Sequence, residues 1–264
     1  VQILSMRRLN MFIEGEFLVL FLLFLIALLY SSVGHGGASG YLAILSLTIY
    51  AEYDSGWLKQ HAWALNLVVA AIAFYHYKKA GFFNLELATP FIVASVPFAI
   101  IGGFMKVDGA FYDTLLSITL VWAAYKLFRI GGDFSKEEIV APRIAYALPI
   151  GGAIGLMSGF IGVGGGIFLS PILLLKKWAD PKTAAATAAL FIWVNSMAGL
   201  IGAKASGQLV IDIEILLPFI VAVVLGGFLG AKYGSENARQ SLIRTLLVVV
   251  LIVASIKRIS YILV

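Results

Sequence analysis

The strongest constraint on this chain is an internal repeat. The sequence Pro-Phe-Ile-Val-Ala at residues 90–94 recurs unchanged at residues 218–222, an offset of 128 (218 − 90) in a chain of 264 residues. The same offset relates five further pairs: Gly34 and Gly162, Gly36 and Gly164, Gly37 and Gly165, Glu86 and Glu214, and Gly102 and Gly230. Two copies of one fragment in an apolar chain are typical of secondary transporters. A duplicated helical bundle without a transport role is the alternative.

The composition indicates that most of the chain is surrounded by lipid and not by water. The sequence is 61% hydrophobic and 12% charged, with a mean hydropathy of +0.98. Soluble domains are about half apolar and about a quarter charged, so a soluble core of this size could not bury so much apolar surface. The net charge of +5 lies in short basic clusters beside apolar runs, which indicates loop anchoring and not a nucleic-acid surface. The absence of cysteine excludes disulfides and cysteine metal sites.

Each half contains five apolar segments, which predicts an all-α integral membrane protein. The segments are 17–33, 38–50, 62–77, 86–105 and 111–129, then 144–162, 166–176, 183–203, 211–231 and 241–259. The second segment of each half is short and is separated from the first by glycine, so each half is expected to contain a glycine-broken helix hairpin. We divide the chain into a membrane repeat at 1–130, a polar linker at 131–142 and a second membrane repeat at 143–264.

Loop charges predict that the two repeats insert with opposite orientation. The loop at 51–56 is acidic, whereas its counterpart at 176–182 is basic. After the third segment the bias changes sides, because the first half has Lys78 and Lys79 and the second has only Lys204. Under the positive-inside rule, this alternation indicates an inverted repeat. A parallel duplication is the alternative, and Arg7 and Arg8 favour it, because the inverted scheme places the N-terminus outside.

Two glycine motifs, at residues 31–40 and 158–166, are the candidate binding elements. Glycine clusters break a helix and free main-chain amides, which are tolerated at membrane depth only inside protein or beside a wet cavity. Amides at the start of the following half-helix also carry the positive end of its dipole, so together they form an anion site without a formal charge. We expect the two sites to meet near the bilayer centre. Close helix packing is the alternative. Neither motif has the Lys-Ser/Thr ending of a nucleotide-binding loop.

Polar residues near these motifs complete the candidate site. Asn66 and Asn195 each lie in the third segment of their half, offset by 129 (195 − 66), and either donate to a substrate or hold helices together. His35 could donate to an anion or couple transport to protons, or have a structural partner. The complete set of expected substrate-binding residues is Gly34, His35, Gly36, Gly37, Ser39, Asn66, Gly162, Gly164, Gly165, Gly166, Thr187, Asn195 and Ser196.

Several other residues are expected to have structural roles. Glu86 and Glu214 start their segments and are interpreted as helix caps. The three histidines lack metal-site spacing, so no metal is expected, and no cofactor is expected either. The tryptophans near segment ends are interpreted as anchors at the membrane interface: Trp57, Trp63, Trp122, Trp178 and Trp193. No pair of carboxylates and no nucleophile with a base lies inside the apolar segments, which disfavours an enzyme.

The glycine motifs resemble a known family. Residues 34–37 and 162–171 are similar to the paired glycine signatures of the TauE/SafE sulfite exporter family, also called the 4-toluene sulfonate uptake permease family. Residues 185–188, followed by Asn195 and Ser196, are similar to the family's next helix, and the resemblance extends over nearly the whole chain. His35 and Ala43, which stands where the second half has Pro171, depart from the pattern. The resemblance implies a multi-pass carrier of the cell inner membrane for sulfite, sulfonates or other small organic anions.

We therefore expect a secondary transporter that moves small sulfur-containing anions by alternating access. An anion channel, or a carrier of carboxylate anions on the same scaffold, is the alternative. The expected partners are a small anionic substrate and the lipid bilayer, with a coupling proton or ion and a second copy of the chain as further candidates, and no nucleic acid. The sequence leaves the direction of transport open.

Overall fold

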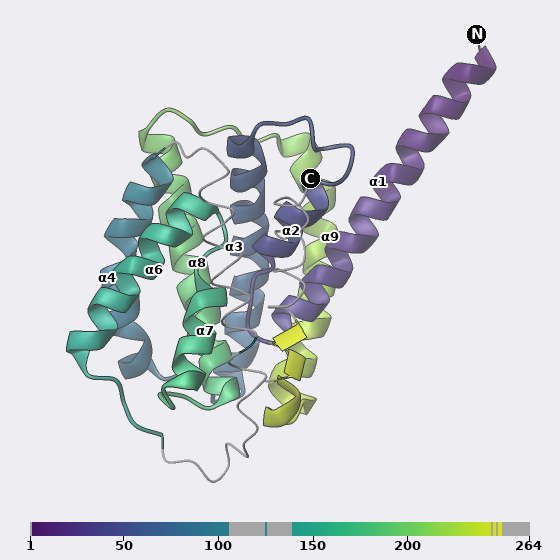
Figure 1. Ribbon diagram of the computed structural model, residues 1–264. Helices are drawn as coiled ribbons and strands as arrows, with labels where there is room; N and C mark the ends of the chain where they lie inside the picture. Colours follow the sequence, from purple (N-terminus) through teal and green to yellow (C-terminus); the bar gives the residue numbers. More distant parts are fainter. Residues whose placement is uncertain (1, 106–124, 126–138, 244, 247, 250–264) are drawn as a thin grey trace.

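A computed structural model describes residues 2–105, 125, 139–243, 245–246 and 248–249. The described residues contain helices and no strand, which confirms the all-α membrane fold class. The helices are α1 (Gln2–Ser31), α2 (Ala38–Leu45), α3 (Ser55–Lys79), α4 (Leu85–Phe104), α6 (Ile144–Ile161), α7 (Gly166–Leu175), α8 (Pro181–Ala205) and α9 (Ile213–Lys232), followed by the π-helical turn η2 (Tyr233–Asn237). Figure 1 shows their arrangement.

The helix starts repeat between the two halves because the same capping chemistry recurs. Asp54 accepts a hydrogen bond from the amide of Trp57 at the start of α3, and Asp180 accepts two at the start of α8. Asn84 and Asp212 cap α4 and α9 in the same way. An oxygen-bearing side chain at this position satisfies amides that have no partner inside the helix. The expected starts of α4, α8 and α9 are confirmed to within two residues, although Asn84 and Asp212 are the caps and Glu86 and Glu214 lie in the first turn. Helix α3 starts at residue 55, seven residues before the predicted segment, α1 starts at residue 2 and not 17, and α2 ends at Leu45, earlier than the segment 38–50 predicted.

Helices α3 and α8 lie side by side at the centre and run in opposite directions (Figure 1). The amide nitrogen of Gln60, near the start of α3, donates to the carbonyl of Gln208, just after the end of α8, at 2.6 Å. The carbonyl of the same side chain accepts from the amide of Val210 at 2.5 Å. At the other end, the Lys182 ammonium lies 4.8 Å from the ring centroid of Phe82, which follows α3.

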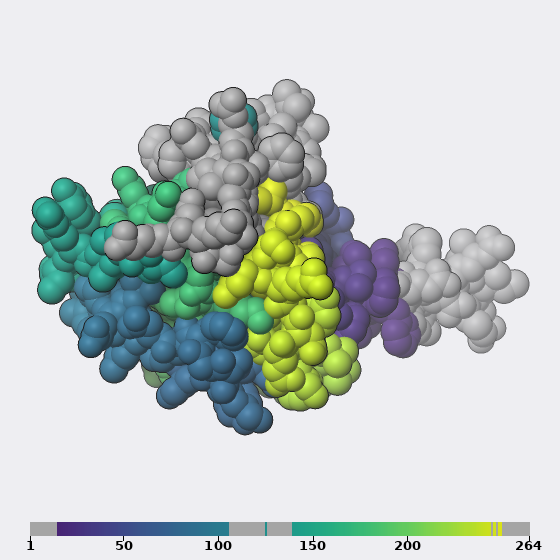
Figure 2. Space-filling view, turned by 90° about the horizontal axis from the view of Figure 1, so that it is seen from below, coloured from purple at the N-terminus to yellow at the C-terminus, as the bar shows by residue number. Residues whose placement is uncertain are grey.

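Each half contributes a first helix that packs against the fourth helix of the other half. Gly226 and Gly230 of α9 touch the main chain of α1 at Phe24 and Leu28. In the same manner, glycines 151, 155 and 159 of α6 touch the main chain of α4 at residues 91, 95 and 99. In each pair, the residue numbers increase on both helices from one contact to the next. Helix α1 therefore runs parallel to α9, and α4 runs parallel to α6. Figure 2 shows the end of the molecule where α4 and α6 begin and where α9 and η2 end.

The same reasoning orients the remaining helices. Helix α4 runs parallel to α8, because Ser95 meets Asn195 and Gly103 meets Gly199. Helix α3 runs parallel to α9, because His61 meets Asp212 and Val69 meets Gly227. Two groups of parallel helices therefore exist, one made of α1, α3 and α9 and the other of α4, α6 and α8. The two groups run in opposite directions.

Four helical segments are long and apolar enough to cross a membrane: Leu85–Phe104, Ile144–Ile161, Pro181–Ala205 and Ile213–Asn237. Helix α3 has the length of α8 but carries buried polar side chains and lies inside the bundle. The expected fifth segment of the first half, 111–129, lies outside the described residues except for Tyr125. Most of the linker at 131–142 and most of the segment 241–259 lie outside them as well.

Candidate functional site

The two glycine motifs form turns that lead into the short helices α2 and α7. Gly37 precedes α2 with φ of 96°, and Gly165 precedes α7 with φ of 80°. Gly34, Gly162 and Gly164 also have positive φ, at 75°, 88° and 72°. L-residues with a side chain rarely adopt this conformation, so the turns depend on glycine. The predicted breaks between the first and second segments are confirmed in both halves.

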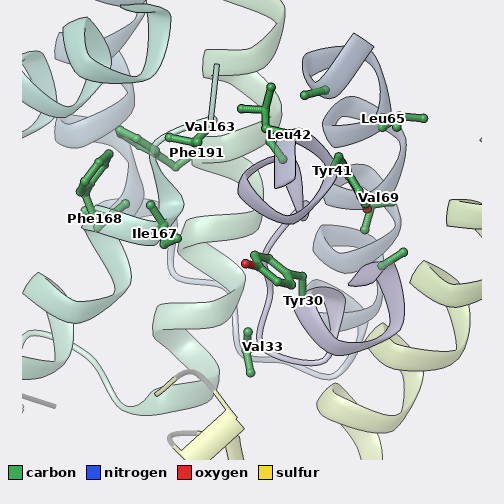
Figure 3. Close-up of a cluster of buried hydrophobic side chains, with 14 of the residues drawn as sticks. Tyr30, Val33, Tyr41, Leu42, Leu65, Val69, Val163, Ile167, Phe168 and Phe191 are labelled. Atoms are coloured by element: carbon green, nitrogen blue, oxygen red, sulfur yellow. The ribbon is translucent and has the colours of Figure 1, made fainter. Parts of the chain in front are cut away.

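The two turns meet in the interior of the bundle. The imidazole Nε2 of His35, in the first turn, lies 3.3 Å from the hydroxyl of Ser170 in α7. Gly36 and Gly164 both lie against the amide side chain of Asn66 in α3. Figure 3 shows Tyr30 and Tyr41 of the first hairpin across from Val163 and Ile167 of the second. Residues 128 apart in the sequence therefore share one location.

Asn66 joins the turns to the central helices. Its side-chain oxygen accepts a hydrogen bond of 3.0 Å from the amide of Ala38, the first residue of α2. Its side-chain nitrogen donates at 3.2 Å to the hydroxyl of Ser196 in α8. All three residues are buried. One amide at the start of α2 is thus already satisfied by a neutral carbonyl, at the place where the sequence analysis expected a free anion-binding group.

Other amides of the turns have no hydrogen-bond acceptor among the residues that the structure describes. Among the described residues, the main-chain nitrogens of Gly36, Gly37, Gly164 and Gly165 donate no hydrogen bond. A buried main-chain N–H without a partner is costly, and such groups in native structures call for an explanation. Here four of them lie in two turns that touch the same asparagine. This arrangement is able to hold a small group that carries several hydrogen-bond acceptors.

Asn195 lies apart from this cluster, although the sequence analysis paired it with Asn66. Its side-chain nitrogen donates to the hydroxyl of Ser95 in α4 at 3.0 Å and to the carbonyl of Phe191 at 2.8 Å. The helix starts show why: Asp54 and Asp180 are offset by 126 (180 − 54), so the position in α8 equivalent to Asn66 is Ile192. The constant offset assumed for the pair was wrong by three residues.

The remaining expected binding residues differ in their surroundings. Ser39 is buried and shares a hydrogen bond of 3.0 Å with the hydroxyl of Tyr30. The hydroxyl of Thr187 and the Nδ1 atom of His35 are buried and have no hydrogen-bond partner among the described residues. Gly166 starts α7, and a Cβ atom built on it would lie 3.3 Å from Cδ2 of His35. His35 and Gly166 therefore belong to the meeting point of the turns.

Sequence analysis missed Lys59, which lies beside the second turn, and misinterpreted Trp63, which lies next to Lys59. Lys59 of α3 lies against Gly162, since its Cβ and Cδ atoms would be 3.3 Å from a Cβ atom built there. Trp63, one helical turn further along, is 0% exposed, so its interpretation as an interface anchor was wrong, as it was for Trp57 at 3%. The spacing of Lys59, Trp63 and Asn66 places them on one face of α3, a signal that the sequence already contains.

The side chains around the two turns are hydrogen-bonding groups of the amide, hydroxyl and imidazole types. Within the ranges described by the structure, no group of three or more histidine, cysteine, aspartate or glutamate side chains is arranged to hold a metal ion. The donors at the meeting point of the turns are amides, hydroxyls and an imidazole. Such groups can donate hydrogen bonds to a solute that is rich in acceptors.

A helical bundle with several membrane-crossing helices and two interrupted hairpins is a multi-pass membrane protein, and its relatives define a class of transporters. Residues 19–258 match the family described as Sulfite exporter TauE/SafE. The chain is 36% identical over 238 residues to "Probable membrane transporter protein y4hK" of Sinorhizobium fredii, covering 89% of this chain and 94% of that protein. It is 27% identical to "Probable membrane transporter protein MJ0441" of Methanocaldococcus jannaschii, covering 87% and 92%. No solved structure gives a significant match.

This chain therefore belongs to the TauE/SafE sulfite exporter family of membrane transporters. The resemblance inferred from the glycine motifs is confirmed. The names of the relatives indicate a transporter and not an enzyme.

Proposed function

We propose that this protein is a secondary carrier for a small sulfur-containing oxyanion such as sulfite or an organic sulfonate. The observation that carries the proposal is the meeting of two glycine turns whose amides at Gly36, Gly37, Gly164 and Gly165 lack partners among the described residues. Several N–H groups directed at one point favour an anion with several oxygen acceptors. The family name, which refers to sulfite export, supports the choice of sulfur chemistry.

Asn66 has a defined part in this binding mode. Its side-chain oxygen accepts a hydrogen bond from the amide of Ala38. An arriving oxyanion offers a charged acceptor, which forms a stronger hydrogen bond than a neutral carbonyl. The anion replaces the asparagine oxygen at Ala38, while the asparagine nitrogen and the Ser196 hydroxyl donate to its other oxygens. The imidazole of His35, a residue of the first turn, supplies a further N–H.

The carrier works by alternating access of two inverted repeats. Helices α1, α3 and α4 each run opposite to their counterparts α6, α8 and α9, which supports an inverted duplication. The exchange of first helices between the halves couples their movements, because α1 follows α9 and α6 follows α4. The glycine turns lie between the halves, so rocking of one half against the other exposes the site to each side in turn.

Charge at the two ends supports an orientation in the cytoplasmic membrane. One end, where α3 finishes and α8 starts, carries Lys78, Lys79, Arg143, Lys176, Lys177, Lys182, Lys232 and Arg239. The opposite end has four basic residues among the described ones, Arg7 and Arg8 in the first part of α1 together with Lys59 and Lys204, and also carries Glu52, Asp54, Asp212 and Glu214. By the positive-inside rule, the basic end faces the cytoplasm.

Sulfite flux in proteoliposomes tests the proposal. The purified chain is expected to give saturable sulfite transport that is stimulated by sulfite on the opposite side. The double variant Gly36→Leu with Gly164→Leu should abolish this flux, because both side chains would occupy the space of Asn66 and the turn amides. Gly81→Leu is the matched control, since Gly81 also has positive φ, at 84°, but has no atom within 4 Å of a built Cβ.

The outcomes separate the proposal from its alternatives. Flux through the double variant equal to that of the wild type would refute the role of the turns. Large single-channel currents in planar bilayers would identify a channel. A thermal-shift screen with sulfite, methanesulfonate, sulfate and acetate tests the ligand class, because a ligand that binds only the folded state raises the melting temperature. Stabilisation by acetate alone would refute sulfur specificity.

A further inference from the structure

A row of hydrogen-bond donors leads along α3 from its first turn to the glycine turns. Lys59, Trp63 and Asn66 follow one another at spacings of four and three residues, which places them on the same side of a helix. The row starts near the end of the bundle and stops at Asn66, where the two glycine turns meet. All three side chains end in N–H groups, although the asparagine also has an acceptor.

Lys59 and Trp63 contact each other within the row, and the indole of Trp63 has an N–H without an acceptor among the described residues. The Lys59 ammonium lies 4.9 Å from the centroid of the Trp63 ring, and its stem covers Gly162. The indole Nε1 of Trp63 is buried and has no hydrogen-bond partner among the described residues. The ring edge that carries this nitrogen faces α8, since a Cβ atom built on Gly199 would lie 2.8 Å from Cε2. An unpaired buried N–H next to a cation points to an acceptor that arrives from outside.

We propose that Lys59 and Trp63 form the entry path by which the anionic substrate reaches the glycine turns from the acidic end of the molecule. The path rests on the proposed anion transport and adds residues that contact the substrate before it reaches the turns. This end carries Glu52, Asp54 and Asp212, which repel an anion. Lys59 attracts the anion past these carboxylates, and the indole N–H then donates a hydrogen bond to one substrate oxygen on the way to Asn66.

Transport kinetics test the charge at the start of the path. Lys59→Gln should raise the KM for sulfite about tenfold, the loss expected when one charge-assisted hydrogen bond is removed. Lys59→Arg should restore a KM within about threefold of the wild type. Lys204→Gln removes the same charge at the same end but on an exposed position of α8, so its KM should change by less than about twofold. Trp63→Phe keeps an aromatic ring but loses the N–H and should raise the KM as well.

Cysteine labelling gives a second readout that does not depend on flux. The chain has no cysteine, so the wild type is a natural blank, and Ser196→Cys places a thiol of similar size at the inner end of the path. Negatively charged sulfonatoethyl methanethiosulfonate should modify Cys at position 196 at least about fivefold faster than its trimethylammonium analogue, after each rate is normalised to a free thiol. Adding Lys59→Gln should remove the preference.

The two proposals fail in distinguishable ways. An unchanged KM in Lys59→Gln, or equal normalised labelling rates for the two reagents, would overturn the entry path while leaving the glycine turns as the binding site. Normal flux through the variant with leucine at both turn glycines would overturn the binding site itself. If Lys59→Gln yields too little folded protein for kinetics, the ratio of the two normalised labelling rates in Ser196→Cys, which retains Lys59, still supports or refutes the entry path.

Discussion

Gly164→Ala is the most informative single change, because the structure supplies its internal control. A Cβ atom on Gly164 would lie 2.6 Å from Nδ2 of Asn66, 2.8 Å from Cγ2 of Ile192 and 3.1 Å from the hydroxyl of Ser196. Gly207, in the connection after α8, has nearly the same φ, 71° against 72°. A Cβ atom on Gly207 would meet nothing within 4 Å. The two alanine variants therefore share the backbone cost and differ only in crowding.

The expected magnitudes follow from these two terms. Placing a side chain in the left-handed region costs about 1–2 kcal/mol, and both variants lose this amount. Overpacking in a filled interior costs a further ~1–3 kcal/mol, which applies to Gly164→Ala alone. At about 2–4 °C per kcal/mol for a chain of this size, Gly164→Ala should melt about 2–12 °C below Gly207→Ala. Sulfite flux should fall in the first variant and stay at the wild-type level in the second.

Thermal unfolding in detergent, followed by intrinsic tryptophan fluorescence, measures the difference, and flux is compared at a temperature well below both transitions. Equal melting temperatures would show that nothing crowds Gly164, and the meeting of the turn with Asn66 and Ser196 would then be refuted. A large difference in melting temperature together with equal flux would support the packing around Gly164 but would refute a role of this turn in transport.

Three further predictions follow from the same contacts. Asn66→Ala should abolish sulfite flux and destabilise the fold by about 1–3 kcal/mol, because it unpairs a buried amide, whereas Asn195→Ala should destabilise it and leave flux intact. Gly226→Leu should separate α1 from α9 and lower the melting temperature, whereas Val221→Leu, at a side chain that is 61% exposed, should not. Ile192→Asn should place an acceptor beside α7 and weaken sulfite binding, measured by thermal shift.

The positions of the helices could be predicted from the sequence because local signals determine them. Apolar runs bounded by Asp54, Asn84, Asp180 and Asp212 contain both the hydrophobic pattern and the caps. The glycine breaks were equally predictable, since only glycine supports the positive φ found in both turns. The helices that pack across the halves could not be predicted, because the match of α1 to α9 depends on glycines more than 190 residues away in the chain.

Register explains why the candidate site was only partly predicted. The repeat offset is 128 between Gly37 and Gly165, then 126 between Asp54 and Asp180, and again 128 between Asn84 and Asp212. Two residues are thus missing from the second half before α8 and are regained after it. No single offset can pair the third helices correctly, and at a helical period of 3.6 a shift of three residues moves a side chain to a different neighbour.

The true counterparts show that the two turns are not chemically equivalent. Asn66 caps the first turn through the amide of Ala38, whereas its counterpart Ile192 packs its aliphatic side chain against Gly166 and offers no acceptor. One amide at the start of α2 is therefore paired with a side-chain oxygen of α3, whereas the start of α7, with the positive end of its dipole, has no such acceptor at the equivalent position of α8. The two turns therefore share their glycine conformations but differ in the side chain that α3 or α8 places against them. In the proposed binding mode, an anion at the second turn lies beside Ser196 and Asn66, and the Asn66 oxygen returns to the Ala38 amide when the anion leaves.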